Sequence, residues 1–245
     1  DVERSRGLGD VYKRQGTDHD DERRSIMKGF LKKDLALLYN TGKVYLAVIA
    51  MGIVLGLVNK EMRSFSSSFI MIMLALAGAS TLSYDDFENG MPFLISLPVS
   101  KKTYIKEKYL ICFLSGAVGL VIAAVLGSVI FKMPLIHGEE PMLFVFPVYF
   151  AIAEIMTAVM IPTRIKFGPE KSRIVGMGFV VAIFLASFCI GYLFKLFSVD
   201  IDALIRDAQE NIPKLALVLG VMGFCMVIML ISYTFSVKAL EKKEF

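Results

Sequence analysis

Apolar residues gather into six long runs that alternate with short polar segments. An α-helix needs about 20 apolar residues to cross a bilayer, and most of these runs approach that length. We therefore expect an all-α, polytopic membrane protein, in which residues 27–245 form a single domain of six transmembrane helices. The expected spans are residues 42–58, 65–82, 110–131, 142–162, 174–197 and 215–237.

The segment before the first run divides at Met27. Residues 1–26 are polar and charged, and they contain no apolar stretch of the kind that a signal peptide requires. We interpret them as a non-native or disordered leader, with Met27 as the natural start. After Met27, an apolar face with lysines beside it predicts an elbow helix in the membrane interface. The residues on that face are Met27, Leu31, Leu35 and Leu38.

Small and hydroxyl-bearing residues inside the runs indicate close helix packing. Gly52 and Gly56 form a GxxxG pattern in the first span, and Gly116 and Gly119 lie in the third. Glycines allow the backbones of two membrane helices to approach each other. Serines and threonines near the ends of the second span can donate hydrogen bonds to helix carbonyls, so they are tolerated in lipid.

The polar segment between the second and third spans carries a helical pattern of its own. Its apolar positions are Phe87, Met91, Leu94 and Ile95. They share one face of a short helix, and the acids before it lie where the helix dipole favours negative charge. Pro98 ends this helix, and Ser100 can cap the next one, which runs through several lysines into the third span.

Two interpretations of this amphipathic helix stay open on its pattern alone. It can rest on lipid headgroups, or its apolar face can fill a groove on a soluble partner. The acids at its front favour a protein partner, because anionic lipid would repel them.

The same segment resembles one family of membrane proteins. Residues 84–88, 94–102 and 106–109 are similar to the stretch after the second span in ABC-2 type transporter permeases, the small bacterial six-span permease subunits of ABC exporters. In that family this loop carries a cytoplasmic coupling helix that contacts a separate ATPase subunit. The resemblance implies that the ATPase-contacting residues are Asp85, Asp86, Phe87, Glu88, Met91, Leu94, Ile95 and Pro98.

Composition and charge placement support a membrane protein and orient it. The chain is 56% hydrophobic, whereas soluble domains are about 45–50% apolar. Lysines and arginines concentrate at both ends, in the 84–109 loop and in residues 163–173, which form a second polar loop, and they are sparse in the other connections. By the positive-inside rule, we expect both termini and the coupling helix to face the cytoplasm. The resemblance implies that the membrane is a bacterial plasma membrane.

Residues that carry chemistry are few. Cys112, Cys189 and Cys225 lie inside apolar runs, where thiols are expected to be buried packing groups, and His19 and His137 stand far apart. We therefore expect no disulfide framework and no metal site. The sequence contains no Walker-type phosphate loop. We accordingly expect no cofactor and no enzymatic activity, with ATP hydrolysis assigned to a separate subunit.

Glu154 is the one acid deep inside an apolar run. A charge at the middle of a bilayer costs about 2.5–3.5 kcal/mol. Glu154 can line a translocation path, or it can be a protonated side chain that makes a polar contact with a neighbouring helix. A proton-coupled role is a third alternative.

The resemblance, together with the charge pattern, leads us to expect the permease subunit of an ABC-2 type exporter. It would couple ATP hydrolysis by its ATPase subunit to export of a peptide, lipid or hydrophobic drug. The expected partners are that ATPase, a second permease subunit and membrane lipid, with no nucleic acid. The alternatives are a non-transporting membrane scaffold or immunity protein, and an intramembrane enzyme that uses Glu154.

Overall fold

The computed structural model describes residues 27–85, 90, 100–136, 141–196 and 213–242. Every regular element within these ranges is a helix. The leader, residues 1–26, lies outside them, as does most of the predicted coupling helix. The elements are the N-terminal helix Met27–Asn40, α2 (Gly42–Val58), the 3-10 turn η1 (Lys60–Met62), α3 (Arg63–Asp85), α5 (Lys101–Val125), the π-helical turn η3 (Leu126–Ile130), α6 (Met142–Leu196) and α8 (Lys214–Glu241).

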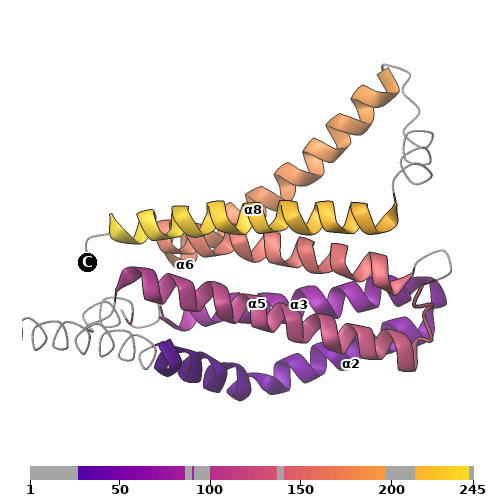
Figure 1. Ribbon diagram of the computed structural model, residues 1–245, viewed down its shortest axis with the longest axis horizontal. Coiled ribbons are helices and arrows are strands. Elements are labelled where there is room, and N and C mark those ends of the chain that lie inside the picture. Colours follow the sequence, from indigo (N-terminus) through magenta and orange to yellow (C-terminus); the bar gives the residue numbers. More distant parts are fainter. Residues whose placement is uncertain (1–26, 86–89, 91–99, 137–140, 197–212, 243–245) are drawn as a thin grey trace, which may run out of the picture.

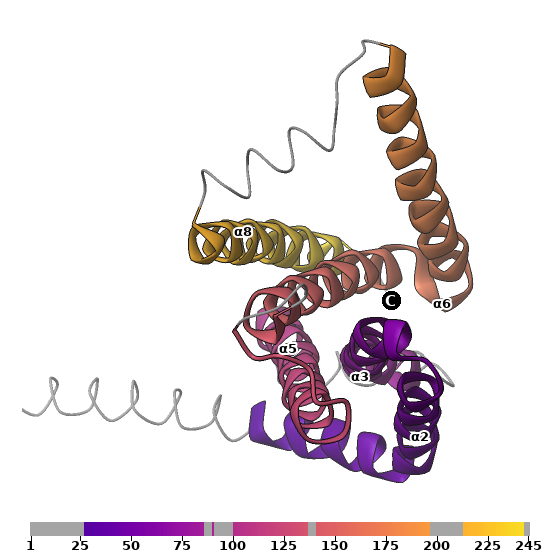
Figure 2. The same ribbon diagram turned by 90° about the vertical axis from the view of Figure 1, so that its right-hand side faces the viewer.

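The helices lie side by side in an elongated bundle, from which the second half of α6 projects (Figure 1). α3 contacts α2, α5 and α6, whereas α8 packs against α6 and α5 on one side only. The view in Figure 2, turned by 90°, shows the same arrangement. α3 is accordingly the most buried of the long helices and α8 the least.

Four helical segments in the described ranges are long and apolar enough to cross a membrane. They are Lys60–Asp85, Lys101–Ile130, Met142–Gly168 and Lys214–Glu241. The N-terminal helix and α2 pass the same test only together, and counting them as one bent span gives five. The all-helical, multi-pass architecture is therefore confirmed, while the finer division into six spans stays a prediction.

The chain bends by 57° between the N-terminal helix and α2. Thr41 lies at the bend, and its hydroxyl donates to the carbonyl oxygen of Leu37 at 3.0 Å, which satisfies a carbonyl at the end of the helix. The buried residues of the N-terminal helix are Phe30 and Asp34, whereas Leu35 is 53% exposed. A helix is thus present where the sequence predicted one, although the face packed on the bundle is not the leucine face. Its position in the membrane interface stays a prediction.

Glycines bring the central helices into backbone contact. A Cβ atom added to Gly78 of α3 would lie only 2.7 Å from the Cα of Cys112 on α5, so no side chain fits between them. Three of the glycines that were predicted to allow close approach, Gly52, Gly116 and Gly119, do face neighbouring helices, which confirms the prediction for them. Gly56 faces the ring of Phe131, which follows η3 and is not part of a helix.

The hydroxyl groups of α3 find acceptors within the bundle. Ser67 donates to the carbonyl oxygen of Arg63 at 3.0 Å, and Thr81 donates to that of Gly78 at 2.9 Å. Ser66 reaches across to the backbone of α2. These bonds explain why a serine-rich helix can occupy the centre of an apolar bundle, since each buried hydroxyl has a partner.

α6 departs from the prediction of two spans joined by a polar loop over residues 163–173. The helix continues through this segment, and Gly168 alone leaves the helical conformation, with φ of 78° and ψ of 177°. Pro169 follows, and a proline disfavours the helical conformation of the residue before it. Glycine adopts the positive φ without steric cost, and proline suits the first position of the helix that resumes. The loop prediction is therefore wrong. We call residues 169–196 the α6 arm.

The α6 arm leans away from the remaining helices in both views (Figures 1 and 2). It carries Cys189, which is exposed, whereas the thiols of Cys112 and Cys225 are buried. The expectation of buried thiols therefore holds for two of the three cysteines and is wrong for Cys189.

Candidate functional site

Five charged or ionisable side chains meet where the N-terminal helix, α3 and α5 converge at one end of the bundle. We call this group the ion cluster. Four of its members are buried, and Lys33 is partly exposed. The members are Lys33, Asp34, Asp85, Glu107 and Lys108.

Lys108 is the centre of the ion cluster. Its side chain is only 1% exposed, and its Nζ lies 2.6 Å from Oδ2 of Asp85. The same Nζ pairs with Asp34 and lies 3.4 Å from the hydroxyl of Thr81. One lysine on α5 therefore joins carboxylates from the N-terminal helix and from the last turn of α3.

Asp85 receives further partners around this lysine. The hydroxyl of Tyr104 donates to Oδ2 of Asp85 at 2.9 Å, and Lys33 pairs with Oδ1. Phe30 packs edge-on against the Tyr104 ring, with the ring centroids 6.0 Å apart. Aromatic rings thus shield part of the cluster from solvent. Ionic interactions are stronger in such a shielded environment than in water.

Glu107 has the weakest interactions with the other members of the ion cluster. It is fully buried, and within the described part of the chain neither of its oxygens makes a hydrogen bond. Its Oε2 lies 3.7 Å from the Nζ of Lys108, which already serves two other carboxylates. Three carboxyl groups therefore share two lysines, and removal of the buried Lys108 would leave buried negative charge without sufficient compensation.

The predicted ATPase-contact residues begin at the ion cluster. Asp85 is the last residue of α3 and directs its carboxylate into the cluster. The other predicted contact residues lie outside the described residues: Asp86, Phe87, Glu88, Met91, Leu94, Ile95 and Pro98. The structure therefore describes one of the two residues that flank the coupling segment, which we call its roots, and not the segment itself.

The other root of the segment is Ser100, which caps α5 as predicted. Its Oγ accepts a hydrogen bond from the backbone N–H of Thr103 at 3.2 Å. The next residue, Lys101, donates to the carbonyl oxygen of Leu240 at 3.0 Å. This places a cation at the last turn of α8, where the helix dipole favours positive charge. The loop is thus attached at one end to the ion cluster and at the other to α8.

Sequence reasoning missed the ion cluster. It assigned Lys33 and Lys108 to cytoplasmic loop charge, and it gave Asp34 and Glu107 no role. A usable signal was present: Asp34 follows Phe30 by four residues, so the two share a helix face, and Lys108 directly precedes a long apolar run. Charges next to apolar faces favour buried pairing, but the sequence alone does not say with which partner.

Glu154 lies in the contact between α6 and α5. It is 1% exposed, and a Cβ atom added to Gly116 would collide with its carboxyl group. Neither carboxyl oxygen has a hydrogen-bond partner among the residues that the structure places. The missing side chain of Gly116 makes the room in which this acid is packed. Path lining and polar contact between helices both stay predictions for Glu154.

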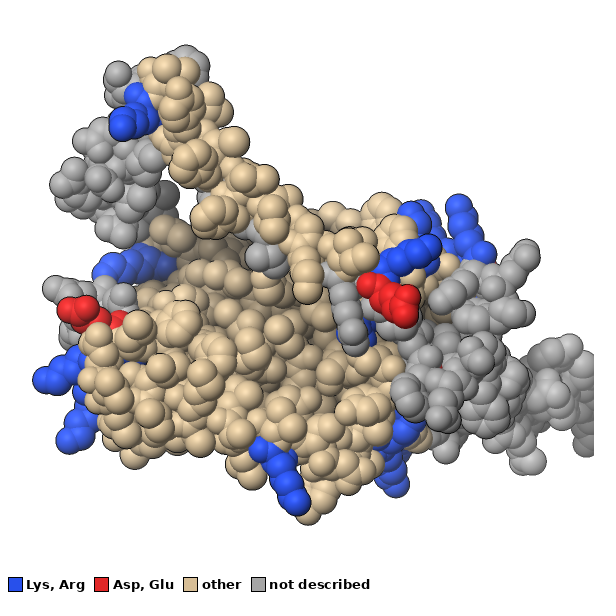
Figure 3. All heavy atoms as spheres, turned by 180° about the vertical axis from the view of Figure 1, so that it is seen from behind, with Lys and Arg blue, Asp and Glu red and all other residues tan. Residues whose placement is uncertain are grey.

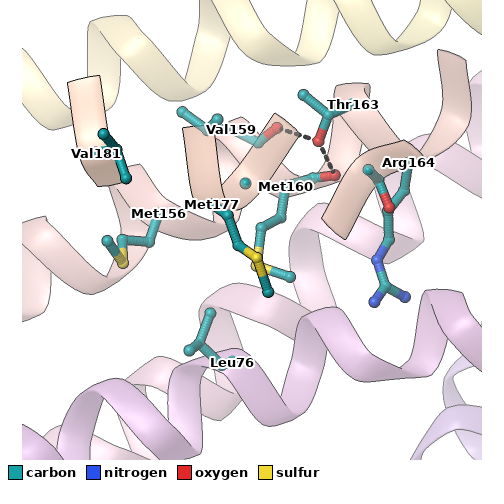
Figure 4. Close-up of a pocket in the computed structure, with 10 residues that line it drawn as sticks. Leu76, Met156, Val159, Met160, Thr163, Arg164, Met177 and Val181 are labelled. Carbon is teal, nitrogen blue, oxygen red and sulfur yellow. Dashed lines mark hydrogen bonds between the residues drawn. The ribbon is translucent and has the colours of Figure 1, made fainter. Parts of the chain in front are cut away.

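An apolar cavity of about 610 Å³ lies between α3, the first half of α6 and the α6 arm. In Figure 4 the side chains of Met160 and Met177 point toward Leu76 of α3. The Thr163 hydroxyl donates to carbonyl oxygens of its own helix, at 2.9 and 2.8 Å, as the dashed lines in Figure 4 show. Arg164 lies at one end and donates to Ser83. The rest of the lining is Met156, Val159, Ser172, Gly176 and Val181.

Comparison with known proteins places these features in a family. No curated protein and no solved structure matches the chain. A family model described as ABC-2 family transporter protein matches residues 29–241, which include the ion cluster, both roots of the 86–99 segment and all the helices from α2 to α8. Because this match covers well over half of the sequence, the chain belongs to the ABC-2 family of transporter proteins.

Proposed function

We propose that this multi-pass membrane protein is the permease subunit of an ABC exporter and that its 86–99 segment receives the ATPase subunit. Membership in the ABC-2 family makes the chain the membrane component of a transporter and not its catalyst. The ATPase contact, the outward direction of transport and the cargo are the parts that we propose. The ion cluster is the observation that carries the proposal.

The ion cluster supports mechanical coupling because it lies at the root of the proposed contact segment. A displacement of that segment acts first on Asp85, which is bound to Lys33 of the N-terminal helix and to Lys108 of α5. Packed protein interiors have low compressibility and transmit strain. Movement of the loop by an ATPase would therefore reach three helices at once. We propose that Asp85 serves the ATPase contact as its anchor.

The apolar cavity supports a hydrophobic cargo. Six of its ten lining residues are leucine, valine or methionine, and the hydroxyl of Thr163 is already bonded within its own helix. Methionine side chains are flexible and polarisable, so they adapt to ligands of different shape. Among the three expected classes of cargo, we therefore favour a lipid or a hydrophobic drug over a peptide, whose backbone polar groups would lack partners there.

We further propose that a second permease subunit, identical or related, packs beside this one. Large apolar side chains on α8 and on the α6 arm remain exposed, including Phe224, Leu230 and Phe188. Either lipid or a second subunit must cover such surfaces in a membrane. Both are partners in this proposal.

The proposal is tested by co-expressing the full chain with a candidate ATPase subunit that contains a Walker motif. We expect the two to co-purify, and we expect Leu94→Asp to abolish co-purification, because a charge would enter the apolar face of the coupling helix. Leu135→Asp is the matched control, because Leu135 is 59% exposed in the connection between η3 and α6, at the end of the bundle opposite the loop. Unchanged co-purification of the Leu94→Asp variant would contradict the assigned contact. A chain that binds no ATPase would favour the scaffold alternative.

A further inference from the structure

A second pocket, of about 670 Å³, lies at the end of the bundle opposite the ion cluster. α3 connects the two sites, since it begins at Arg63 beside this pocket and ends at Asp85 in the cluster. The pocket is formed where the turn η1 faces the chain that follows η3. Its lining residues are Lys60, Glu61, Arg63, Ser64, Lys132, Met133 and Pro134.

The pocket has an excess of positive charge. It is lined by three cations, Lys60, Arg63 and Lys132, and by one acid, Glu61. None of the four is ion-paired to another residue that the structure describes. The first turn of α3 contains no acid, so the N-terminal end of that helix adds to the positive potential. An anion is therefore the ligand that this charge distribution would attract.

Two costly features hold the cations around the pocket. Lys132 has φ of 52°, a conformation that few residues other than glycine adopt. Arg63 donates from Nη1 to the carbonyl oxygen of Phe131 at 2.8 Å, while its Nε is buried and has no hydrogen-bond partner in the described part of the chain. Strained backbone and unsatisfied donors persist at binding sites more than elsewhere, because the site requires that geometry.

The surroundings of the pocket indicate the source of the anion. Large apolar side chains near it in sequence are exposed: Met62, Phe65, Val129, Ile130 and Leu135. Figure 3 shows many of the charged side chains toward the two ends of one face of the molecule, with a largely uncharged surface between them that cationic side chains interrupt at the lower edge. A phospholipid is complementary to this pattern, because its anionic headgroup matches the cations and its apolar chains match the exposed apolar side chains. We propose that the pocket binds the phosphate headgroup of an anionic membrane phospholipid.

Native mass spectrometry of the full chain, purified in a neutral detergent at low salt, tests this proposal. Dioleoylphosphatidylglycerol is the probe, and dioleoylphosphatidylcholine is the uncharged comparison. The test variant carries Lys60→Gln and Lys132→Asn, because asparagine tolerates the positive φ at that position. A lysine near an anionic lipid surface contributes roughly fivefold in affinity, so we expect a loss of about 25-fold for the double variant.

The controls separate a specific site from general charge. Lys214→Gln removes a cation at the start of α8 that does not line the pocket, and we expect full binding of the anionic lipid. Equal losses in the Lys214→Gln variant and the double variant would overturn the proposal, as would undiminished binding by the double variant. Inorganic phosphate at millimolar concentration is the third probe; if it displaces the lipid completely, the ligand is a free anion and not a phospholipid.

One further variant addresses the chain's own acids. Glu139 and Glu140 follow Lys132 closely in sequence but lie outside the described residues. We expect the double substitution Glu139→Gln and Glu140→Gln to leave phosphatidylglycerol binding unchanged. Lipid binding that appears only in this variant would show that these acids neutralise the pocket, and it would overturn the proposal.

Discussion

Replacing Lys108 by methionine tests whether the ion cluster holds three helices together. Methionine keeps the length and volume of the lysine stem and removes the ammonium group. Because Lys108 is 1% exposed, the substitution would leave the carboxylates of Asp34 and Asp85 buried next to one remaining lysine, Lys33. Breaking a buried ion pair from one side costs about 3–5 kcal/mol.

The matched control is Lys33→Met, the same substitution in the same cluster. The Lys33 side chain is 33% exposed, so solvent screens its pairs, and exposed pairs contribute about 0–1 kcal/mol. For a chain of this size, 1 kcal/mol shifts the unfolding temperature by about 2–4 °C. We therefore expect a decrease of roughly 6–20 °C for Lys108→Met and less than about 4 °C for Lys33→Met.

A fluorogenic maleimide measures these unfolding temperatures in detergent. Cys112 and Cys225 are buried and react only when the bundle opens, whereas Cys189 is exposed, so a Cys189→Ser background removes its signal. A variant that combines Lys108→Met with Asp34→Asn and Asp85→Asn should recover much of the loss, because the two carboxylates that pair with Lys108 are neutralised together with it. Equal unfolding temperatures for the Lys108→Met and Lys33→Met variants would refute the reasoning.

Three further substitutions test the packing and the cavity. Gly78→Ala should destabilise the protein markedly, because the added Cβ meets the backbone of α5. Gly223→Ala on α8 is the control: its added Cβ meets nothing within 4 Å, and the substitution should stabilise the protein by about 1 kcal/mol through helix propensity. The same thermal assay compares the two variants, and a Gly78→Ala variant as stable as wild type would contradict the close contact. Gly168→Ala should cost about 1–3 kcal/mol, because φ of 78° with ψ of 177° is a combination that essentially only glycine adopts. Gly178→Ala is the control in the α6 arm, since an added Cβ meets nothing within 4 Å there; equal effects of the two substitutions would mean that the backbone conformation of Gly168 is not the cause. Met160→Trp should fill part of the apolar cavity and reduce export of a hydrophobic dye from vesicles while ATPase co-purification is retained; unchanged export would exclude this cavity from the path.

The elements that local pattern controls were predictable from the sequence. Long apolar runs predicted the apolar helices, of which four or five are long enough to cross a membrane, although the division into six spans is not confirmed. Ser100 predicted the start of α5, because a serine side chain caps the helix that follows it directly. Glycines at positions such as Gly52 predicted close helix contact, since the absence of a side chain has the same consequence whichever helix approaches.

The ion cluster was not predictable because its contacts are not local. Asp34 and Lys108 pair across 74 positions of sequence. In the sequence each appears as a single charge next to an apolar stretch, a pattern that solvent-facing residues share. Only the convergence of three helices makes them partners, and that convergence depends on packing over the whole bundle.

The break in α6 was half predicted. The predicted polar loop over residues 163–173 contains the interruption at Gly168, before Pro169, but the charged residues around them suggested a loop where the helix in fact continues. Lysine, arginine and glutamate are good helix formers, so the helix continues on both sides once the glycine has absorbed the change of direction. Polarity was therefore a weaker guide to structure than backbone preference.

The break at Gly168 divides the part of α6 that lines the apolar cavity into two segments, so the angle between these segments affects the width of the cavity. Met177 and Val181 line the cavity from beyond Gly168, while Met156 and Met160 line it from before. Val181 lies about 20 Å along the helix from the break, so a rotation of about 10° at Gly168 would displace it by about 3 Å. Two backbone angles of one glycine thus set the separation between the two sides of this cavity.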